Sequence, residues 1–226
     1  MFELDHVSLI YDMEKEEKVY AVNDVSMQPP NTGLVGIIGP SGSGKSSLMY
    51  CLSTLKKPTS GKICYNGKNF SEATQRELEH LRRDQFGFVF QHHFLISYMS
   101  IQDNIIVAAK ENPAKAREHA LELLKKLRIK ESEAAKKSKH LSGGQRQRAA
   151  IARALINEPF VLFADEPTAS LDHENAFLVM HFLEEYAKNH LVVLITHDHS
   201  ILQNADRIIE IWDGEVSEKG EQNETI

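Results

Sequence analysis

The stretch Gly39-Pro-Ser-Gly-Ser-Gly-Lys-Ser-Ser47 is the most informative part of this chain. It follows an apolar segment, Leu34–Ile38, that predicts a buried strand, and it opens a segment that predicts a helix. Glycine has no Cβ, so the glycines of the stretch let backbone N–H groups converge on phosphate oxygens, and a helix N-terminus adds positive potential. The stretch therefore predicts a loop that binds the phosphates of a nucleotide.

Two side chains in this stretch make the prediction specific. Lys45 adds a full positive charge, and Ser46 supplies a hydroxyl to Mg²⁺, a cation that takes few protein oxygens and is otherwise bound by phosphates and water. A flexible loop between a strand and a helix would explain the glycines, but not Lys followed by Ser at this offset. The residues expected to contact the nucleotide here are Gly39, Ser41, Gly42, Ser43, Gly44, Lys45, Ser46 and Ser47.

The length suits one large α/β domain with an inserted subdomain, which we favour, or two small domains. The chain has 226 residues, of which 42% are hydrophobic, and no apolar run approaches the ~20 residues that a membrane-spanning helix requires. The N-terminus lacks the cationic and then apolar pattern of a secretory signal, so we expect a cytosolic protein. Cys51 and Cys64 show neither metal-ligand nor redox spacing and are interpreted as small buried or half-buried residues.

Charge is distributed unevenly along the chain. The net charge of −6 argues against a nucleic-acid groove, yet residues 110–153 contain 13 Lys/Arg against 5 Asp/Glu, or +8. Solvated helical faces explain such a stretch most simply. The alternative is a surface that faces anionic lipid headgroups or an acidic partner.

Apolar periodicity predicts an alternation of strands and helices. Two strands, Phe2–Tyr11 and Val19–Met27, are expected to flank a turn at Glu14–Lys18, and the helix that begins at Lys45 is expected to reach Leu55. The strands expected at 160–164 and 191–195 are separated by the helix expected at 174–188, and this βαβ spacing implies a parallel sheet. The remaining expected elements are a hairpin at Gly61–Gly67, helices at 75–83 and 114–127, a helix after Gln145, a linker at Lys130–His140, and strands at 86–90 and 207–212.

Acidic residues follow one of the predicted core strands. Asp165 and Glu166 come at its carboxyl end, where parallel α/β sheets bind ligands. Asp165 is suited to support Mg²⁺, and Glu166 to orient or deprotonate an attacking water. Helix capping alone would not require two adjacent acids beside a phosphate-binding loop.

Two further polar residues also end core strands. His197 ends the strand that starts at Leu191 and can hold the attacking water while donating to a terminal phosphate. Gln91 ends the strand that starts at Phe86, and its amide can bind Mg²⁺ or water through a contact that loop movement would break. An isolated Gln or His is weak evidence for a catalytic role, so both assignments depend on the neighbouring motifs.

A second glycine turn, Leu141-Ser-Gly-Gly-Gln145, also opens into a helix. Ser142 is a suitable N-cap, and Ser142, Gly143, Gly144 and Gln145 form a second candidate phosphate site. Because the first loop already holds one nucleotide, a surplus anion site implies two copies packed head to tail, each covering the other's nucleotide.

These motifs together resemble the ATP-binding cassette (ABC) ATPases, in the right order and over nearly the whole chain. The resemblance implies a P-loop NTPase core with a mainly parallel sheet, an N-terminal antiparallel β subdomain and an inserted α-helical subdomain. It assigns residues 1–226 to one domain, with 1–90 and 157–226 as the α/β core and 91–156 as the helical subdomain. It also implies that Glu166, His197 and Gln91 are catalytic, and that ATP and Mg²⁺ are the cofactors.

The resemblance extends to further residues and partners. Asp172, in Ser170-Leu-Asp172, would contact nucleotide across the dimer, Tyr11 would stack on adenine with Val19 or Val22 beside it, and Mg²⁺ would be held by Ser46, Gln91 and Asp165. The chain looks most similar to the lipoprotein-release and macrolide-export subgroup, whose bacterial ATPases work with separate membrane subunits at the cytoplasmic face of the membrane.

The membrane subunit is expected to dock near Gln91–Ile105. Phe94, Leu95, Ile96, Tyr98 and Met99 form an apolar cluster there, although these side chains could instead fill the core of the helical subdomain.

The implied function is ATP-driven export or extraction of lipoprotein, peptide or drug. The alternative is an ATPase that regulates a membrane signalling or cell-wall-remodelling complex without moving a substrate. A third class, the DNA-repair or ribosome-associated cassettes, would require long coiled coils or two cassettes in one chain, and neither is present.

Overall fold

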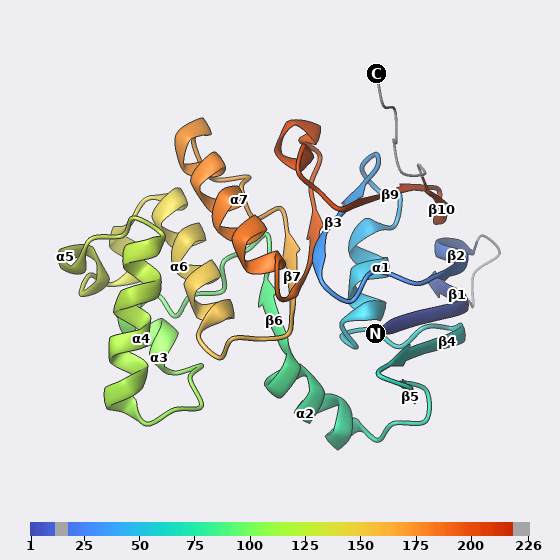
Figure 1. Cartoon of the computed structure of the whole chain (residues 1–226), viewed down its shortest axis with the longest axis horizontal. Helices are drawn as coiled ribbons and strands as arrows, with labels where there is room; N and C mark the ends of the chain where they lie inside the picture. Colours follow the sequence, from blue (N-terminus) through green and yellow to red (C-terminus); the bar gives the residue numbers. More distant parts are fainter. Residues whose placement is uncertain (12–17, 219–226) are drawn as a thin grey trace.

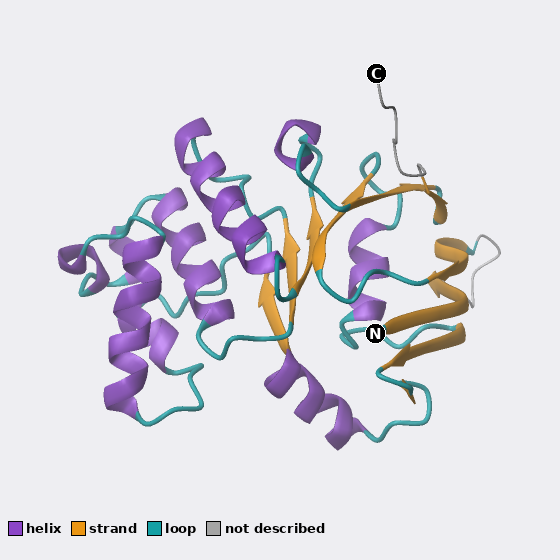
Figure 2. Ribbon diagram, in the orientation of Figure 1, coloured by secondary structure: helices purple, strands orange, loops and turns teal. Residues whose placement is uncertain are grey.

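The computed structural model describes residues 1–11 and 18–218. The turn expected at Glu14–Lys18 therefore lies almost wholly outside the described residues. Within them, the strands gather into two sheets, and several of the helices group at one end of the molecule (Figure 1 and Figure 2). The strands are β1 Phe2–Tyr11, β2 Val19–Met27, β3 Gly33–Ile38, β4 Ser60–Tyr65, β5 Lys68–Asn69, β6 Phe86–Val89, β7 Val161–Asp165, β8 Leu191–Ile195, β9 Arg207–Trp212 and β10 Glu215–Glu218.

The helices lie between and beside these sheets. Figure 1 shows α1 between the two sheets, and α3 to α6 together at the end remote from β1. The helices are α1 Lys45–Leu52, α2 Gln75–Gln85, α3 Ile101–Ile106, α4 Pro113–Lys126, α5 Glu131–Ala134, α6 Gly143–Leu155 and α7 His173–Ala187, with single 3₁₀ turns at Ser138–His140 and His199–Leu202.

The central sheet is mainly parallel, as the βαβ spacing predicts. Its order is β10-β9-β3-β8-β7-β6, and only β10 runs antiparallel to its neighbour. The second sheet, β2-β1-β4-β5, is antiparallel throughout. The predicted fold class is confirmed by this arrangement.

Side chains of the central strands alternate between two cores. On β7, Leu162 and Ala164 pack with α6 and α7, whereas Val161 and Phe163 pack with α1 and the antiparallel sheet. Successive side chains of a strand point to opposite faces, so a strand covered on both faces is apolar at every position. All five positions of β7 are accordingly buried.

Some element predictions were wrong in detail. The helix expected to reach Leu55 ends at Leu52, and Thr54 adopts a left-handed φ of 61° before the chain turns. The expected linker Lys130–His140 contains α5 and a 3₁₀ turn. The helix α3 was missed, although Ser100 caps it by accepting a hydrogen bond from the Asp103 N–H at 3.0 Å, which is a recognisable start signal.

Candidate functional site

Four strand ends of the central sheet bring the predicted site residues to one edge. The register pairs Val89 with Ala164 and Asp165 with Ile195. Ile37 also pairs with Ile195, so the loop after β3 leaves the sheet beside the end of β8. Because these strands are parallel, the segments that hold Gln91, Asp165, Glu166, His197 and the 39–47 loop all emerge at the same edge.

The path of the 39–47 loop depends on its glycines. A Cβ on Gly39 would stand 2.1 Å from the Ile211 carbonyl oxygen, and one on Gly44 would stand 1.9 Å from the Ala21 carbonyl oxygen. Both residues have positive φ, at 147° and 106°. Only glycine combines this conformation with this close approach of backbone. Gly42, at φ 81°, has no neighbouring atom within 4 Å of its virtual Cβ, so there the requirement is conformational alone.

The polar groups of this loop fit a phosphate ligand. No side chain caps the N-terminus of α1, whose N-cap is Gly44. The Ser43 hydroxyl is buried without a hydrogen-bond partner among the described residues. The Lys45 ammonium donates to the carbonyl oxygens of Gly39 at 2.9 Å and Pro40 at 2.7 Å, which places it within its own loop. An anion would supply the acceptors that the helix end and the ammonium favour.

A hydroxyl and a carboxylate meet beside the start of α1. The Ser46 hydroxyl donates to Asp165 Oδ2 at 3.2 Å, across 119 residues of sequence. Asp165 is only 6% exposed, and burial raises the pKa of its carboxyl while the Ser46 hydrogen bond opposes the shift. These are hard oxygen donors of the kind that Mg²⁺ prefers, and they fit an ion that completes its shell with phosphates and water.

Glu166 and His197 form a pair at the same edge. His197 Nδ1 lies 2.9 Å from Glu166 Oε1, and the Glu166 side chain is 12% exposed whereas that of His197 is 75% exposed. The hydrogen bond to Glu166 raises the pKa of His197. Glu166 holds a left-handed φ of 51°, an uncommon conformation for a residue with a side chain, and its N–H donates to the Ile195 carbonyl oxygen at 3.0 Å.

The second glycine turn lies at the start of α6. Ser142 and Gln145 form a capping box, in which the Gln145 N–H donates to the Ser142 hydroxyl at 3.1 Å. Cβ atoms on Gly143 and Gly144 would meet Ser170 and Leu171 at 3.6 and 3.2 Å, so this turn packs on the segment before α7. Within the described residues, no hydrogen bond or ion pair joins it to the 39–47 loop of the same chain.

The other predicted contacts are placed as follows. Asp172 is the N-cap of α7 and accepts from the Asn175 N–H at 2.9 Å, which lowers the pKa of Asp172. Gln91, Ser41 and Ser142 are exposed, and Ser47 lies half-buried in the first turn of α1.

Tyr11 lies at the end of β1 with one ring face occupied. Lys56 Nζ stands 5.1 Å from the ring centroid. Val19 is the cross-strand partner of Tyr11 and is 53% exposed, whereas Val22 is 1% exposed and belongs to the core. Val22 is therefore unable to contact a bound base, contrary to one of the two expectations for this position.

The cluster predicted at 94–99 is divided between core and surface. Phe94 is 66% exposed and Tyr98 is 73% exposed, while Leu95 packs against the core beneath the helices. The core interpretation therefore applies to Leu95, whereas Phe94 and Tyr98 lie at the surface.

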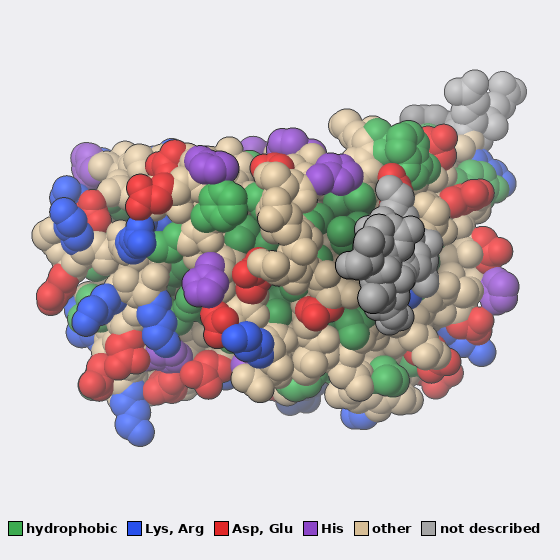
Figure 3. Space-filling view, turned by 45° about the horizontal axis from the view of Figure 1, so that its top comes forward, with side chains coloured by type: hydrophobic (Ala, Val, Ile, Leu, Met, Phe, Trp, Pro, Cys, Tyr) green, Lys and Arg blue, Asp and Glu red, His purple; other side chains and the backbone are tan. Residues whose placement is uncertain are grey.

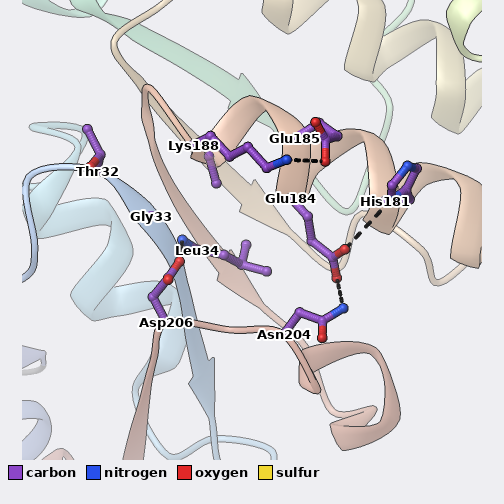
Figure 4. Close-up of a pocket in the computed structure, with 10 residues that line it drawn as sticks. Thr32, Gly33, Leu34, His181, Glu184, Glu185, Lys188, Asn204 and Asp206 are labelled. Carbon is purple, nitrogen blue, oxygen red and sulfur yellow. Dashed lines mark hydrogen bonds and ion pairs between the residues drawn. The ribbon is translucent and has the colours of Figure 1, made fainter.

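A polar hollow of about 500 Å³ lies at the opposite edge of the sheet, where β3 begins (Figure 4). In Figure 4 its polar side chains pair with one another: Asn204 donates a hydrogen bond to Glu184, and Lys188 donates to Glu185. Ligands of parallel α/β sheets bind at the carboxyl ends of strands, so the candidate site is the other edge.

Three functional candidates were missed from the sequence. His93, Gln147 and Arg153 join the 91–99 loop to α6 by side-chain hydrogen bonds. One signal in the sequence could have found them: Gln147 is a polar residue on the same face of the predicted helix as the apolar Ala150 and Ile151. The structure shows that both of these neighbours are fully buried.

Across residues 1–11 and 18–218, none of the helices combines the length and the apolar character needed to cross a bilayer.

Comparison with known proteins gives a consistent set of matches. Residues 22–169 match the protein family described as ABC transporter. LolD of Ehrlichia ruminantium, named as the ATP-binding protein of a lipoprotein-releasing system, is 41% identical over 207 residues, which are 88% of this chain and 90% of LolD.

Longer proteins match over part of their length. PvdT of Pseudomonas entomophila, a pyoverdine export ATP-binding/permease protein, is 40% identical over 96% of this chain and 34% of its own. MacB of Burkholderia pseudomallei, a macrolide export ATP-binding/permease protein, is 42% identical over 89% and 31%. The chain thus spans about a third of the length of these two relatives.

A solved structure shares the fold. The ATP-binding cassette MJ0796, determined as a dimer in a post-hydrolysis state bound to ADP and Pi, superposes with a TM-score of 0.90 at 36% identity and covers 96% of this chain and 97% of its own.

Proposed function

The chain belongs to the ABC transporter family as an ATPase related to the MacB, LolD and PvdT export systems, and we propose that two copies close head to tail around two ATP molecules to drive a separate membrane subunit. The observation that carries the proposal is the meeting of Ser46 with Asp165 at 3.2 Å and of Glu166 with His197 at 2.9 Å at the edge from which the 39–47 loop emerges.

The second glycine turn supports the dimer. Ser142, Gly143 and Gly144 have no hydrogen bond or ion pair to the 39–47 loop of their own chain among the described residues. A γ-phosphate held by that turn would therefore be one bound to another copy. ATP favours the closed dimer only through contacts that the open state lacks, and this turn supplies them. The dimeric state of MJ0796 agrees with this assembly.

Each residue at the edge has a proposed part in hydrolysis. Bound Mg²⁺, held by Ser46 with support from Asp165 and Gln91, would neutralise charge on the phosphates. Glu166 orients or deprotonates the attacking water, because its carboxylate is poorly exposed and already accepts a hydrogen bond. His197 keeps that carboxylate in place and donates toward the γ-phosphate.

The membrane subunit is proposed to dock near Gln91–Ile105. Phe94 and Tyr98 are exposed aromatic side chains on one loop, and aromatic residues are enriched at protein interfaces. Residues 91–156 would then act as a helical subdomain that carries both this docking loop and the second phosphate turn.

The names of the relatives support a proposal for the class of cargo. Their names refer to lipoprotein release, macrolide export and pyoverdine export. We accordingly propose export or extraction of a lipoprotein, peptide or drug, by a bacterial complex with this chain at the cytoplasmic face of the membrane.

Glu166→Gln tests the proposal. The substitution keeps the shape of the side chain but removes its basicity, so ATP should bind normally while turnover falls by at least about 100-fold, the usual contribution of a general base. The trapped complex should sediment as a dimer with ATP and as a monomer with ADP.

Normal hydrolysis by this variant would remove Glu166 from the mechanism. A monomer at all ATP concentrations would contradict the head-to-tail assembly.

A further inference from the structure

We propose that His93, Gln147 and Arg153 form a joint that ties the 91–99 loop to α6, so that the proposed docking loop and the proposed second phosphate turn move as one body. This inference rests on the proposed function, because it links the docking loop to the Ser142–Gly144 turn. It makes His93 and Gln147 positioning residues.

The joint consists of three direct hydrogen bonds between the loop and α6. His93 Nε2 lies 2.7 Å from Gln147 Oε1, and because that oxygen only accepts, the imidazole donates from Nε2. The Arg153 guanidinium donates to the His93 carbonyl oxygen at 2.8 Å and to the Phe94 carbonyl oxygen at 2.6 Å. The residue before the exposed Phe94 is thus held by both its side chain and its backbone.

The far end of the loop is fixed as well. Asn104 on α3 accepts from the Ile96 N–H at 2.6 Å and donates to the Ile96 carbonyl oxygen at 3.1 Å. Phe94 and Tyr98 therefore project from a segment whose backbone is hydrogen-bonded at His93, Phe94, Ile96 and Met99, and a partner that pushes on them loads these fixed points.

A rigid element connects the joint to the phosphate turn. Gln147 and the N-cap Ser142 belong to the same helix, about 8 Å apart along its axis at the α-helical rise. The capping box fixes the first turn of that helix to Ser142. No flexible segment lies between the loop contact and Ser142, Gly143 and Gly144.

The chemistry of Gln147 favours a positioning role over a stabilising one. The side chain is 0% exposed and makes one hydrogen bond, through Oε1, so its Nε2 has no partner among the described residues. A buried amide that is half-satisfied destabilises a fold relative to an apolar residue of the same shape.

Hydrogen exchange in the Glu166→Gln background tests this joint. With ATP, amides at the start of α6 and amides at 93–99 should both become protected in the dimer. Adding Gln147→Met, which keeps the volume and removes the hydrogen bond, should leave the protection at α6 and reduce the ATP-dependent gain at 93–99 roughly two- to tenfold, the range for one net hydrogen bond.

Matched variants separate positioning from general damage. His93→Phe breaks the same bond from its more exposed end and replaces Gln147→Met if that variant does not fold. His92→Phe changes the neighbouring exposed histidine, which lies outside the joint, and should keep the full response at 93–99.

Each outcome is decisive. If the loop response survives in both Gln147→Met and His93→Phe while α6 is protected, or if 93–99 never responds in the Glu166→Gln dimer, the joint is overturned and the proposed function stands. If ATP protects neither segment because no dimer forms, the proposed function fails and the joint with it.

Discussion

At the scale of single residues, the glycines of the 39–47 loop differ in what they require. Gly44 needs both a left-handed φ and the absence of a Cβ, because the Ala21 carbonyl oxygen is 1.9 Å from where that atom would stand. Gly42 needs the φ alone. The proposed nucleotide binding depends on this backbone path, because backbone N–H groups would contact the phosphates.

Alanine substitutions should therefore separate the two requirements. Gly42→Ala should lower the free energy of unfolding by about 1–2 kcal/mol, the cost of a left-handed residue, and retain ATP binding. Gly44→Ala adds a clash with backbone and should cost more and abolish binding. Urea unfolding and ATP titration measure both quantities, and equal effects of the two variants would contradict the argument.

His93 is the residue whose titration should couple to folding. Burial lowers the pKa of His93 below its ordinary value of about 6.5, and nearby Arg146, His92 and Arg153 lower it further, while the Gln147 hydrogen bond opposes the shift. The unfolded chain then binds a proton that the folded chain resists. The stability contributed by neutral His93 is present above pH about 6.5 and is lost as the pH falls through the folded pKa.

The acid sensitivity of folding should decrease in His93→Phe. Its unfolding free energy should fall less between pH 7 and pH 5 than that of the wild type, as measured by urea unfolding at each pH. The exposed His92 serves as the control, since His92→Phe removes only one of the smaller causes of the shift and should retain most of the wild-type slope. An unchanged slope in His93→Phe would show that another group accounts for the acid sensitivity.

At the scale of elements, α6 is joined to α4 by a buried arginine. Arg148 is 8% exposed, and its guanidinium donates to the Leu127 carbonyl oxygen at 2.9 Å and the Arg128 carbonyl oxygen at 3.1 Å. The last carbonyl groups of a helix have no partner within it, so this side chain satisfies groups at the end of α4. Burial lowers the pKa of Arg148, but a guanidinium remains charged at neutral pH.

Arg148→Met should lower the free energy of unfolding by about 1–3 kcal/mol, because it leaves buried carbonyl groups without donors. Arg128→Met, which removes an exposed ion pair with Glu174 at 2.7 Å, should cost only about 0–1 kcal/mol. Urea unfolding of the two variants provides the comparison. A cost for Arg148→Met no larger than for Arg128→Met would show that α4 needs no cap from α6.

At the scale of the whole molecule, the basic stretch 110–153 is only partly available to a partner. Arg146, Arg148 and Arg153 donate to backbone carbonyl groups of this chain. Figure 3 shows Lys and Arg side chains interspersed with Asp and Glu at the helical end of the molecule. Both features reduce the positive electrostatic potential that the basic stretch can present to a partner.

Charge reversal tests contact with anionic lipid. Changing Lys125, Lys126, Lys136 and Lys137 to Glu should reduce association with vesicles that contain phosphatidylglycerol by more than about tenfold at low salt, because each Lys near such a surface contributes about 1 kcal/mol. Vesicle co-sedimentation measures the effect.

A control with the same net charge locates the effect. It carries reversals at four exposed cations elsewhere in the chain, Lys57, Lys62, Lys68 and Arg76. If both variants lose vesicle association equally, the net charge of the whole chain drives the association. If neither loses it, the basic residues of 110–153 are solvated helical faces without a lipid contact.

The sequence by itself determined the features that depend on neighbours along the chain. The phosphate loop needs only glycines, Lys45 and Ser46 between a strand and a helix. The strands β3 and β8 and the first four residues of β7 are apolar because both faces of these strands are covered. Element types and the α/β class followed from periodicity, and the order of motifs was sufficient to indicate the family.

Tertiary structure alone decided which distant residues meet. Ser46 and Asp165 are 119 residues apart, and His93 and Gln147 are 54 apart. Their contacts depend on the strand order β3-β8-β7-β6, on strand register and on how α6 packs, and local periodicity fixes none of these. Burial likewise follows from packing: it placed Val22 in the core, Phe94 at the surface and Gln147 where an amide has too few partners.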